Sequence, residues 1–151
     1  MRIRDFREED RAEYLKMAQI FYGSDAVSHP VDPQHFIRTF DQALAGNPFL
    51  RGFIVDLDGQ CAGFGLISFT WSNEAGGLVV WLEELYIKPE FRNLKLGTQF
   101  MQAVMQEYSG SARRFRLEVS RENTAAKRLY ERLGFEVLDY IQMISDHPGE
   151  L

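Results

Sequence analysis

Two adjacent acidic residues and a basic segment lie close together in the middle of this chain. Glu83 and Glu84 stand in a largely apolar stretch that ends at Ile87, and residues 92–98 (RNLKLGT) then lead into an amphipathic stretch. Carboxylates can take a proton from a reacting group. The first amides of a helix have no partner inside the helix and lie at its positive end, which favours a bound phosphate. These residues therefore predict an enzyme that handles a phosphorylated cofactor.

Hydrophobic periodicity places the two glutamates near the end of a strand and the basic segment before a helix. Asp58-Gly59 predicts a tight hairpin. We expect strands at residues 1–6, 53–57, 61–71, 78–87, 115–119 and 135–144, and helices at residues 8–22, 36–44, 98–108 and 123–133. The order β-α-α-β-β-β-α-β-α-β predicts an α/β (α+β) fold, with a mixed sheet and helices on its faces.

Length and composition indicate one domain over residues 1–151, with a loose tail at 145–151. The single cysteine, Cys61, rules out an internal disulfide and favours a reducing, cytoplasmic compartment. The charged first residues do not resemble a signal peptide, and no apolar run approaches the roughly 20 residues that a membrane span needs. A net charge of −5 argues against nucleic acid as a partner.

Three blocks of the sequence, taken in order, resemble the GCN5-related N-acetyltransferase (GNAT) superfamily. Residues 82–87 (LEELYI) are similar to its fourth strand, and residues 92–98 to its R-x-x-G-x-G/A pyrophosphate loop. Residues 122–135 (ENTAAKRLYERLGF) are similar to its N-x-x-A-x-x-x-Y-x-x-x-G-F pattern. The resemblance implies a mostly antiparallel sheet of about six or seven strands with helices on both faces.

One residue of the loop departs from the family pattern. Lys95 stands where the pattern has its first glycine. If this position needs a positive φ, the lysine carries a strain of roughly 1–2 kcal/mol. If it does not, the extra cation beside the pyrophosphate can help binding.

The resemblance implies that acetyl-CoA binds where the fourth and fifth strands separate. Backbone groups of Leu85 and Ile87, on either side of Tyr86, would pair with the pantetheine amides as a neighbouring strand does. The remaining cofactor-binding residues would be Arg92, Asn93, Leu94, Lys95, Leu96, Gly97 and Thr98 in the loop, with Asn123 and Lys127 near the later helix start. Without the third block, this segment would be an ordinary strand–turn–helix junction, and Asn123 would simply cap its helix.

The catalytic candidates are Glu83, Glu84 and Tyr130. Neighbours on a regular strand face opposite sides, so we expect only one of the glutamates to point into the cleft. The likeness to polyamine-acetylating members of the family points to Glu83. That carboxylate would deprotonate an amine with a pKa of ~10.4. Tyr130 would protonate the departing thiolate, and its alternative role is that of a core tyrosine.

The resemblance also implies an acceptor: a primary amine of a small molecule or a peptide, acetylated by direct attack in a ternary complex. Tyr22, Asp25, His29 and Trp71 are candidates for the acceptor pocket. The spacing of the histidines and aspartates matches no metal-ligand pattern, so no metal is expected. A homodimer is a further expectation. The alternative function is a non-catalytic CoA-binding or acetyl-CoA-binding module that acts as a sensor or partner subunit.

Overall fold

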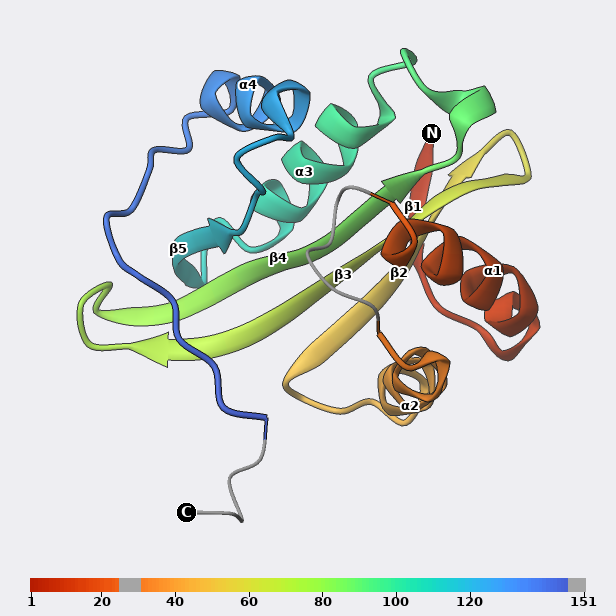
Figure 1. Ribbon diagram of the computed structural model, residues 1–151, viewed down its shortest axis with the longest axis horizontal. Helices are drawn as coiled ribbons and strands as arrows, with labels where there is room; N and C mark the ends of the chain where they lie inside the picture. Colours follow the sequence, from red (N-terminus) through yellow and green to blue (C-terminus); the bar gives the residue numbers. More distant parts are fainter. Residues whose placement is uncertain (25–30, 147–151) are drawn as a thin grey trace.

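One five-stranded sheet forms the centre of the structure, a computed structural model that describes residues 1–24 and 31–146 (Figure 1). Its elements are, in chain order, β1 (Arg2–Asp5), α1 (Arg11–Tyr22), α2 (Pro33–Leu44), β2 (Leu50–Leu57), β3 (Gln60–Ser72), β4 (Gly77–Ile87), α3 (Leu96–Glu107), β5 (Ala112–Leu117) and α4 (Thr124–Arg132). Short 3-10 turns at Glu8–Asp10 and Pro89–Phe91 precede α1 and the loop before α3.

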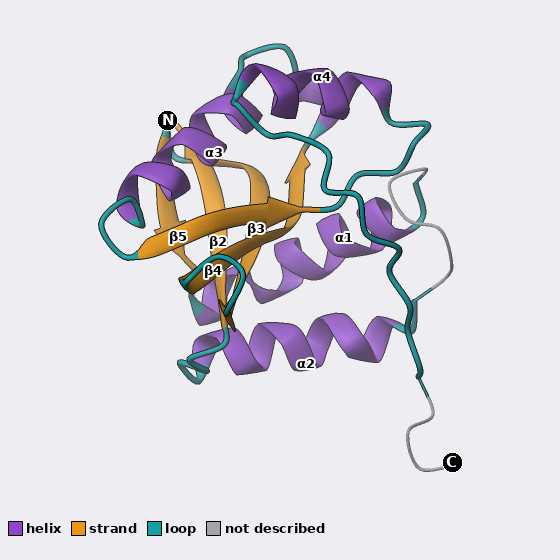
Figure 2. Cartoon of the chain, turned by 90° about the vertical axis from the view of Figure 1, so that its left-hand side faces the viewer, coloured by secondary structure: helices purple, strands orange, loops and turns teal. Residues whose placement is uncertain are grey.

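The strands lie in the order β1-β2-β3-β4-β5. β1 to β4 pair antiparallel, and β5 joins β4 in parallel after the crossover through α3. Helices α1 and α2 cover one face of the sheet, and α3 and α4 lie on the other (Figure 2). The predicted mixed, mostly antiparallel sheet with helices on both faces is confirmed.

The predicted strand at residues 135–144 is wrong, which is why the described sheet has five strands rather than six or seven. This segment leaves α4 and passes across the sheet without joining it (Figures 1 and 2). After Phe135, which packs against Tyr130, its apolar side chains stay in solvent, since Val137 is 80% exposed and Ile141 is 92% exposed. An apolar run is a strand signal only where a sheet edge pairs with it, and periodicity does not reveal that partner.

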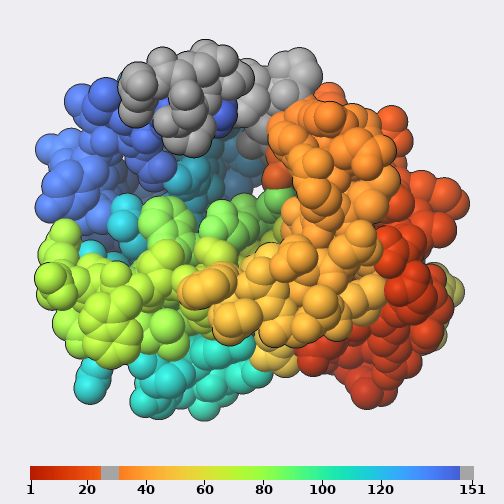
Figure 3. All heavy atoms as spheres, turned by 90° about the horizontal axis from the view of Figure 1, so that it is seen from below, coloured from red at the N-terminus to blue at the C-terminus, as the bar shows by residue number. Residues whose placement is uncertain are grey.

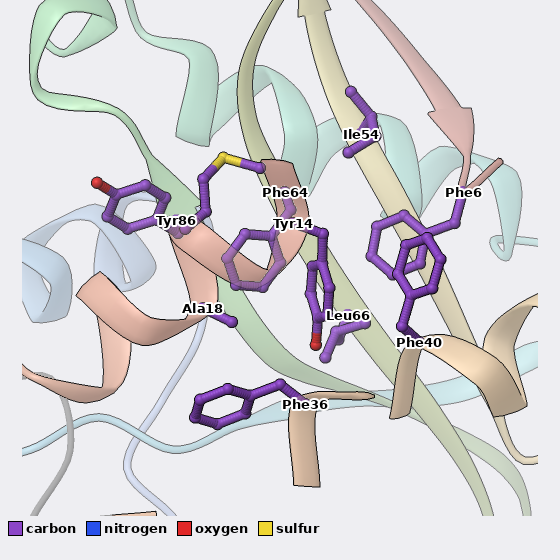
Figure 4. Packing of buried hydrophobic residues seen from close by; sticks show 10 residues of the cluster. Phe6, Tyr14, Ala18, Phe36, Phe40, Ile54, Phe64, Leu66 and Tyr86 are labelled. Atoms are coloured by element: carbon purple, nitrogen blue, oxygen red, sulfur yellow. The ribbon is translucent and has the colours of Figure 1, made fainter. Parts of the chain in front are cut away.

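Aromatic rings fill the layer between the sheet and the first two helices (Figure 4). Tyr14 of α1 lies 5.3 Å from Phe40 of α2 and 5.1 Å from Phe64 of β3, measured between ring centroids. These rings fix α1 against the middle of the sheet. The C-terminal end of α1, which carries Tyr22, is thereby held over β4.

The opposite layer packs α3 flat against the sheet. A Cβ atom at Gly65 of β3 would lie 2.2 Å from the ring of Phe100, so only glycine lets this ring lie on the strand. The Gly63-Phe64-Gly65 stretch therefore has a packing role. The predicted hairpin at Asp58-Gly59 is confirmed, with φ angles of 53° and 83° at its two central residues.

Candidate active site

A β-bulge in β4 sets the position of both glutamates. Leu66 of β3 pairs with Glu84, whereas the next residue, Ile67, pairs with Leu82. Glu83 is therefore the extra residue of the bulge and has no partner of its own across the ladder. A bulge bends its strand and interrupts the strict alternation of side chains.

Both carboxylates consequently lie on the face of the sheet that α1 and α2 cover. Glu84 accepts a hydrogen bond from the hydroxyl of Tyr22 at the end of α1. Glu83 accepts one from the hydroxyl of Ser68, which follows Leu66 by two residues on β3 and so shares its face. The expectation that the two glutamates face opposite sides is wrong, because it assumed a regular strand.

The carboxyl of Glu84 is buried and Glu83 is exposed. The pKa of Glu84 is raised to about 7, chiefly by burial; the hydrogen bond from Tyr22 opposes the rise, and the charge of Glu83 adds to it. Its Oε2 atom is buried and has no hydrogen-bond partner among the described residues. Glu84 thus offers a free oxygen on a group that changes its charge near neutral pH, which suits a general base.

A polar patch that sequence reasoning missed continues from Glu83 across the same face. The indole N–H of Trp81 donates to the hydroxyl of Thr70 at 3.2 Å, and the guanidinium of Arg116 on β5 lies 4.2 Å from the Trp81 ring centroid. Figure 3 shows a hollow between the atoms of α2 and the C-terminal segment, with atoms of β4 and β5 at its base. The alternation of side chains around Trp81 predicts which residues share this face. The bulge at Glu83 breaks that alternation, so the sequence pattern does not show that both glutamates lie on the same face as Trp81.

On its other edge, β4 separates from β5. Their pairing ends at Leu82 and Leu117, although β4 continues to Ile87. No described strand therefore pairs with the last part of β4 on this side. The predicted separation of the fourth and fifth strands is present, and it leaves a free strand edge.

Backbone groups of Leu85 and Ile87 face this free edge. The amide of Lys88 bonds to β3 at Ala62 (2.9 Å), so the preceding odd-numbered residues turn away from β3 by the alternation of the ladder. Arg92 reaches back here, and its Nε donates to the carbonyl oxygen of Ile87 at 3.1 Å. Arg92 therefore lies at the junction of the strand edge and the loop.

The loop before α3 has two residues with left-handed backbone. Asn93 has a φ of 64° and Lys95 a φ of 59°. Lys95 therefore has the positive φ that strains a lysine, and this strain is roughly 1–2 kcal/mol. It also sets the start of α3 at Leu96, two residues before the predicted start.

The start of α3 is shaped to admit a ligand. The amides of Leu96, Gly97 and Thr98 are the first of the helix, and no side chain of Lys95 caps them. Gly97 has no positive φ, and a Cβ atom there would make only ordinary contacts, at 3.6 Å to Leu85 and 3.9 Å to Leu129. Neither backbone nor packing demands this glycine. A pyrophosphate fits this arrangement.

Helix α4 borders the same region. The side chain of Asn123 accepts a hydrogen bond from the amide of Ala126 at 3.2 Å, which confirms it as the N-cap. Tyr130 is half-buried, burial raises its pKa, and its hydroxyl has no hydrogen-bond partner in residues 1–24 and 31–146. Lys127 is exposed, with its Nζ 3.8 Å from a carboxylate oxygen of Glu131.

Comparison with known proteins now adds to this geometry. Residues 5–135 match the Acetyltransferase (GNAT) family. The chain belongs to this family. It is 27% identical over 146 residues to thialysine N-ε-acetyltransferase of Mus musculus, covering 91% of this chain and 85% of that protein. Membership makes the chain an acetyltransferase with acetyl-CoA as its cosubstrate.

Solved structures share the fold of this acetyltransferase. A possible acetyltransferase from Clostridium difficile 630 superposes with a TM-score of 0.80 at 17% identity, with 96% of each chain covered. The aminoglycoside N-acetyltransferase AAC(6')-Iy, in a complex with CoA, superposes with a TM-score of 0.76 at 21% identity, with 96% of this chain and 93% of that one covered.

Other predicted residues of this acetyltransferase are not brought to the glutamates. Asp25 and His29 lie outside the described residues. Trp71 is 76% exposed at the far end of β3, on the face opposite to Thr70. A cavity of about 630 Å³ lies between α3 and α4 and does not touch the glutamates either. The described part of the chain contains no group of three potential metal ligands and no helix long and apolar enough to cross a membrane.

Proposed function

We propose that residues 1–151 form one domain that transfers an acetyl group to a primary amine of a small molecule or peptide. The acceptor and acetyl-CoA bind together, on the two sides of β4. The observation that carries this proposal is the buried Glu84 carboxyl, which has one oxygen free and lies beside the open edge of the same strand.

Glu84 is the proposed general base. An amine with a pKa of ~10.4 is protonated at neutral pH and cannot attack until a base removes its proton. Because the pKa of Glu84 is raised to about 7, it becomes a carboxylate near neutral pH, whereas exposed Glu83 supplies a nearby negative charge. Glu83 thereby attracts the ammonium form of the acceptor, and Glu84 accepts its proton.

The donor side is proposed to act mainly through backbone. Acetyl-CoA supplies the activated acetyl group. The edge of β4 at Leu85 and Ile87 and the first amides of α3 would bind it, and amides of β4 next to the bulge would stabilise the oxyanion. As the new C–N bond forms and the C–S bond breaks, the hydroxyl of Tyr130 gives its proton to the thiolate. The Tyr130 hydroxyl has no hydrogen-bond partner within the described residues, which supports this role.

Names of relatives support a small acceptor. The mouse relative is named for thialysine, and the CoA-bound structural neighbour for aminoglycosides. Both names describe amines with several polar groups. The polar patch from Glu83 to Arg116 suits such an acceptor better than an apolar one.

A non-catalytic acetyl-CoA sensor is the second candidate. The left-handed Lys95 and the contact of Arg92 with the Ile87 carbonyl favour it, because both stand where a cofactor would bind. The buried, half-satisfied carboxyl of Glu84 argues for the enzyme, because a sensor has no use for it.

Assembly and compartment are proposed on separate grounds. A homodimer is supported by the exposed apolar side chains of residues 137–144. A reducing compartment such as the cytoplasm is supported by the single cysteine, Cys61, whose pKa burial raises.

The test is thiol release from acetyl-CoA against a panel of amines: lysine, thialysine, spermidine, an aminoglycoside and a lysine-containing peptide. Calorimetric binding of acetyl-CoA is measured in parallel. We expect binding, together with release that depends on the acceptor. Binding without release from any amine would select the sensor, and absence of binding would contradict both functions.

A further inference from the structure

Arg116 is a half-buried cation that forms no ion pair within residues 1–24 and 31–146, and its closest electrostatic link to an anion is a longer-range attraction that helps to lower the pKa of Glu74. No carboxylate of residues 1–24 or 31–146 lies within ion-pair distance of its guanidinium, whose only contact of note is the Trp81 ring at 4.2 Å. Arg114, two residues earlier on the same strand face, instead has its Nη1 2.8 Å from a carboxylate oxygen of Glu74. In a protein with a net charge of −5, a sheltered arginine left unpaired beside the candidate site needs an explanation.

The ring of Trp81 holds the guanidinium of Arg116 in place. Trp81 pairs with Arg116 across the parallel ladder, and the hydrogen bond of its indole to Thr70 fixes the ring. Stacking on an aromatic face leaves the N–H groups at the guanidinium rim free to donate. Such a fixed fork matches the two oxygens of a carboxylate.

The spacing of the backbones that carry Arg116 and the glutamates limits the ligand. Glu83 is two residues beyond Trp81 on β4, so a rise of roughly 3.3 Å per residue and a strand spacing of about 4.8 Å separate the backbones of Arg116 and Glu83 by about 8 Å. Glu84 is one residue further. In lysine, six single bonds of about 1.5 Å join the distal amine nitrogen to the carboxyl carbon, which spans roughly 7 Å when extended. The α-amine is only two bonds from the carboxyl carbon, so it is too short to reach the glutamates while the carboxylate binds Arg116.

We infer that Arg116, supported by Trp81, binds the carboxylate of a free amino acid whose distal side-chain amine is the acetylated group. This inference rests on the proposed function and names its substrate class. The acceptor lies along the hollow on this face, with its carboxylate over β5 and its reactive amine at the bulge of β4 (Figure 3). Polyamines are disfavoured, because their second ammonium would meet the guanidinium.

The test compares three acceptors that share one reactive amine: lysine, lysinamide and cadaverine. Lysinamide replaces the carboxylate by an amide, and cadaverine lacks it. We expect the unchanged protein to favour lysine in kcat/KM. Arg116→Gln should raise the KM for lysine roughly 10- to 100-fold, the usual value of a charge-assisted contact, with kcat kept. The KM for lysinamide should not change.

Arg113→Gln is the matched control, because Arg113 is exposed and lies on the opposite face of β5. It removes the same charge and should leave all three acceptors unaffected. Arg116→Lys should recover part of the preference for lysine, since it restores charge but not the fork. Thermal unfolding of each variant separates a loss of fold from a loss of recognition.

Three results would overturn the inference. Equal kcat/KM for lysine and lysinamide in the unchanged protein would show that no carboxylate is recognised. An equal loss on all acceptors in Arg116→Gln, or a rise in the KM for acetyl-CoA, would assign Arg116 a structural or cofactor role. Thiol release with no amine at all would instead overturn the proposed function, and the inference with it.

Discussion

The two sides of β4 build their halves of the site in different ways. On the proposed donor side, one continuous segment would supply the contacts, mostly through the backbone of the strand edge and of residues 92–98. On the acceptor side, side chains from distant elements meet, with Tyr22 from α1 and Ser68 from β3 on the two glutamates. Substitutions on the acceptor side should therefore change chemistry, whereas those on the donor side should act more through conformation.

The largest effect is expected from Glu84→Gln. Because the amide cannot accept the amine proton as the carboxylate does, kcat should fall by about 10²- to 10⁴-fold. Acetyl-CoA binding measured by calorimetry should be unchanged, because the Glu84 side chain lies on the sheet face against α1, whereas the proposed cofactor contacts are backbone groups of the free edge and of α3. A variant that keeps full activity would remove Glu84 from the mechanism.

Glu84→Gln should also change how the free energy of unfolding depends on pH. Glu84 has a pKa of about 7 when folded, against an ordinary value of 4.5, so the folded protein binds more protons between these pH values. The contribution of Glu84 to the free energy of unfolding must then fall by about 3 kcal/mol as pH rises from 4.5 to 7 and level off above. Glu84→Gln should abolish this decline. Urea unfolding at pH 5 and pH 8 measures it, and an unaltered slope would show that Glu84 titrates normally.

Tyr130→Phe carries the next largest effect and tests the donor side. Loss of the proton donor to the thiolate should lower kcat by roughly 10²-fold. Stability should change by less than about 1 kcal/mol, because the hydroxyl has no hydrogen bond within the described residues to lose. Single-turnover kinetics with a cosubstrate carrying a better leaving group provide the control. If the rate is still normal with acetyl-CoA, Tyr130 is a packing residue.

Local features of the fold, including the loop and helix start of the proposed donor side, could be predicted from the sequence because their determinants are local. The loop RNLKLGT, the N-cap at Asn123 and the hairpin at Asp58-Gly59 depend on residues within a few positions of each other. Turn chemistry and helix capping operate over this range. The departure at Lys95 was located for the same reason, although its left-handed φ had to be seen in the structure.

The acceptor side could not be predicted because it depends on register. A single extra residue, Glu83, moves both carboxylates to one face, and the separate register of β4 with β5 places Trp81 opposite Arg116. No local pattern marks the position of the bulge. The strand predicted at residues 135–144 failed for a related reason, since pairing with an edge decides whether an apolar run becomes a strand.

Two substitutions with opposite effects on the pKa of Glu84 test the acceptor side. Glu83→Gln removes a like charge and should lower the pKa of Glu84, so the rise of kcat/KM with pH should move to lower pH. Tyr22→Phe removes the hydrogen bond that lowers this pKa and should move the rise to higher pH. The pH profile of each variant is the measurement. If Glu83 itself were the base, Glu83→Gln would instead abolish the rise.

The smallest effect tests whether the donor loop is strained. Lys95→Gly should relieve roughly 1–2 kcal/mol of left-handed strain and lose about 0.5–1 kcal/mol to backbone entropy, a net gain of up to about 1.5 kcal/mol in unfolding free energy. Asn93→Gly is the control, and its gain should be smaller, because asparagine tolerates this backbone. Urea denaturation measures both. Equal gains would show that the lysine is not specially strained.

Calorimetry on the same variant separates strain from charge in the donor loop. If the Lys95 ammonium contributes to pyrophosphate binding, Lys95→Gly becomes more stable while its affinity for acetyl-CoA falls, more steeply at low salt. If the backbone amides of α3 suffice, affinity is kept or improved, because the glycine matches the left-handed geometry without strain. The first result would make this loop depend on a side chain, as the acceptor side does, and the second would keep the two sides of β4 distinct.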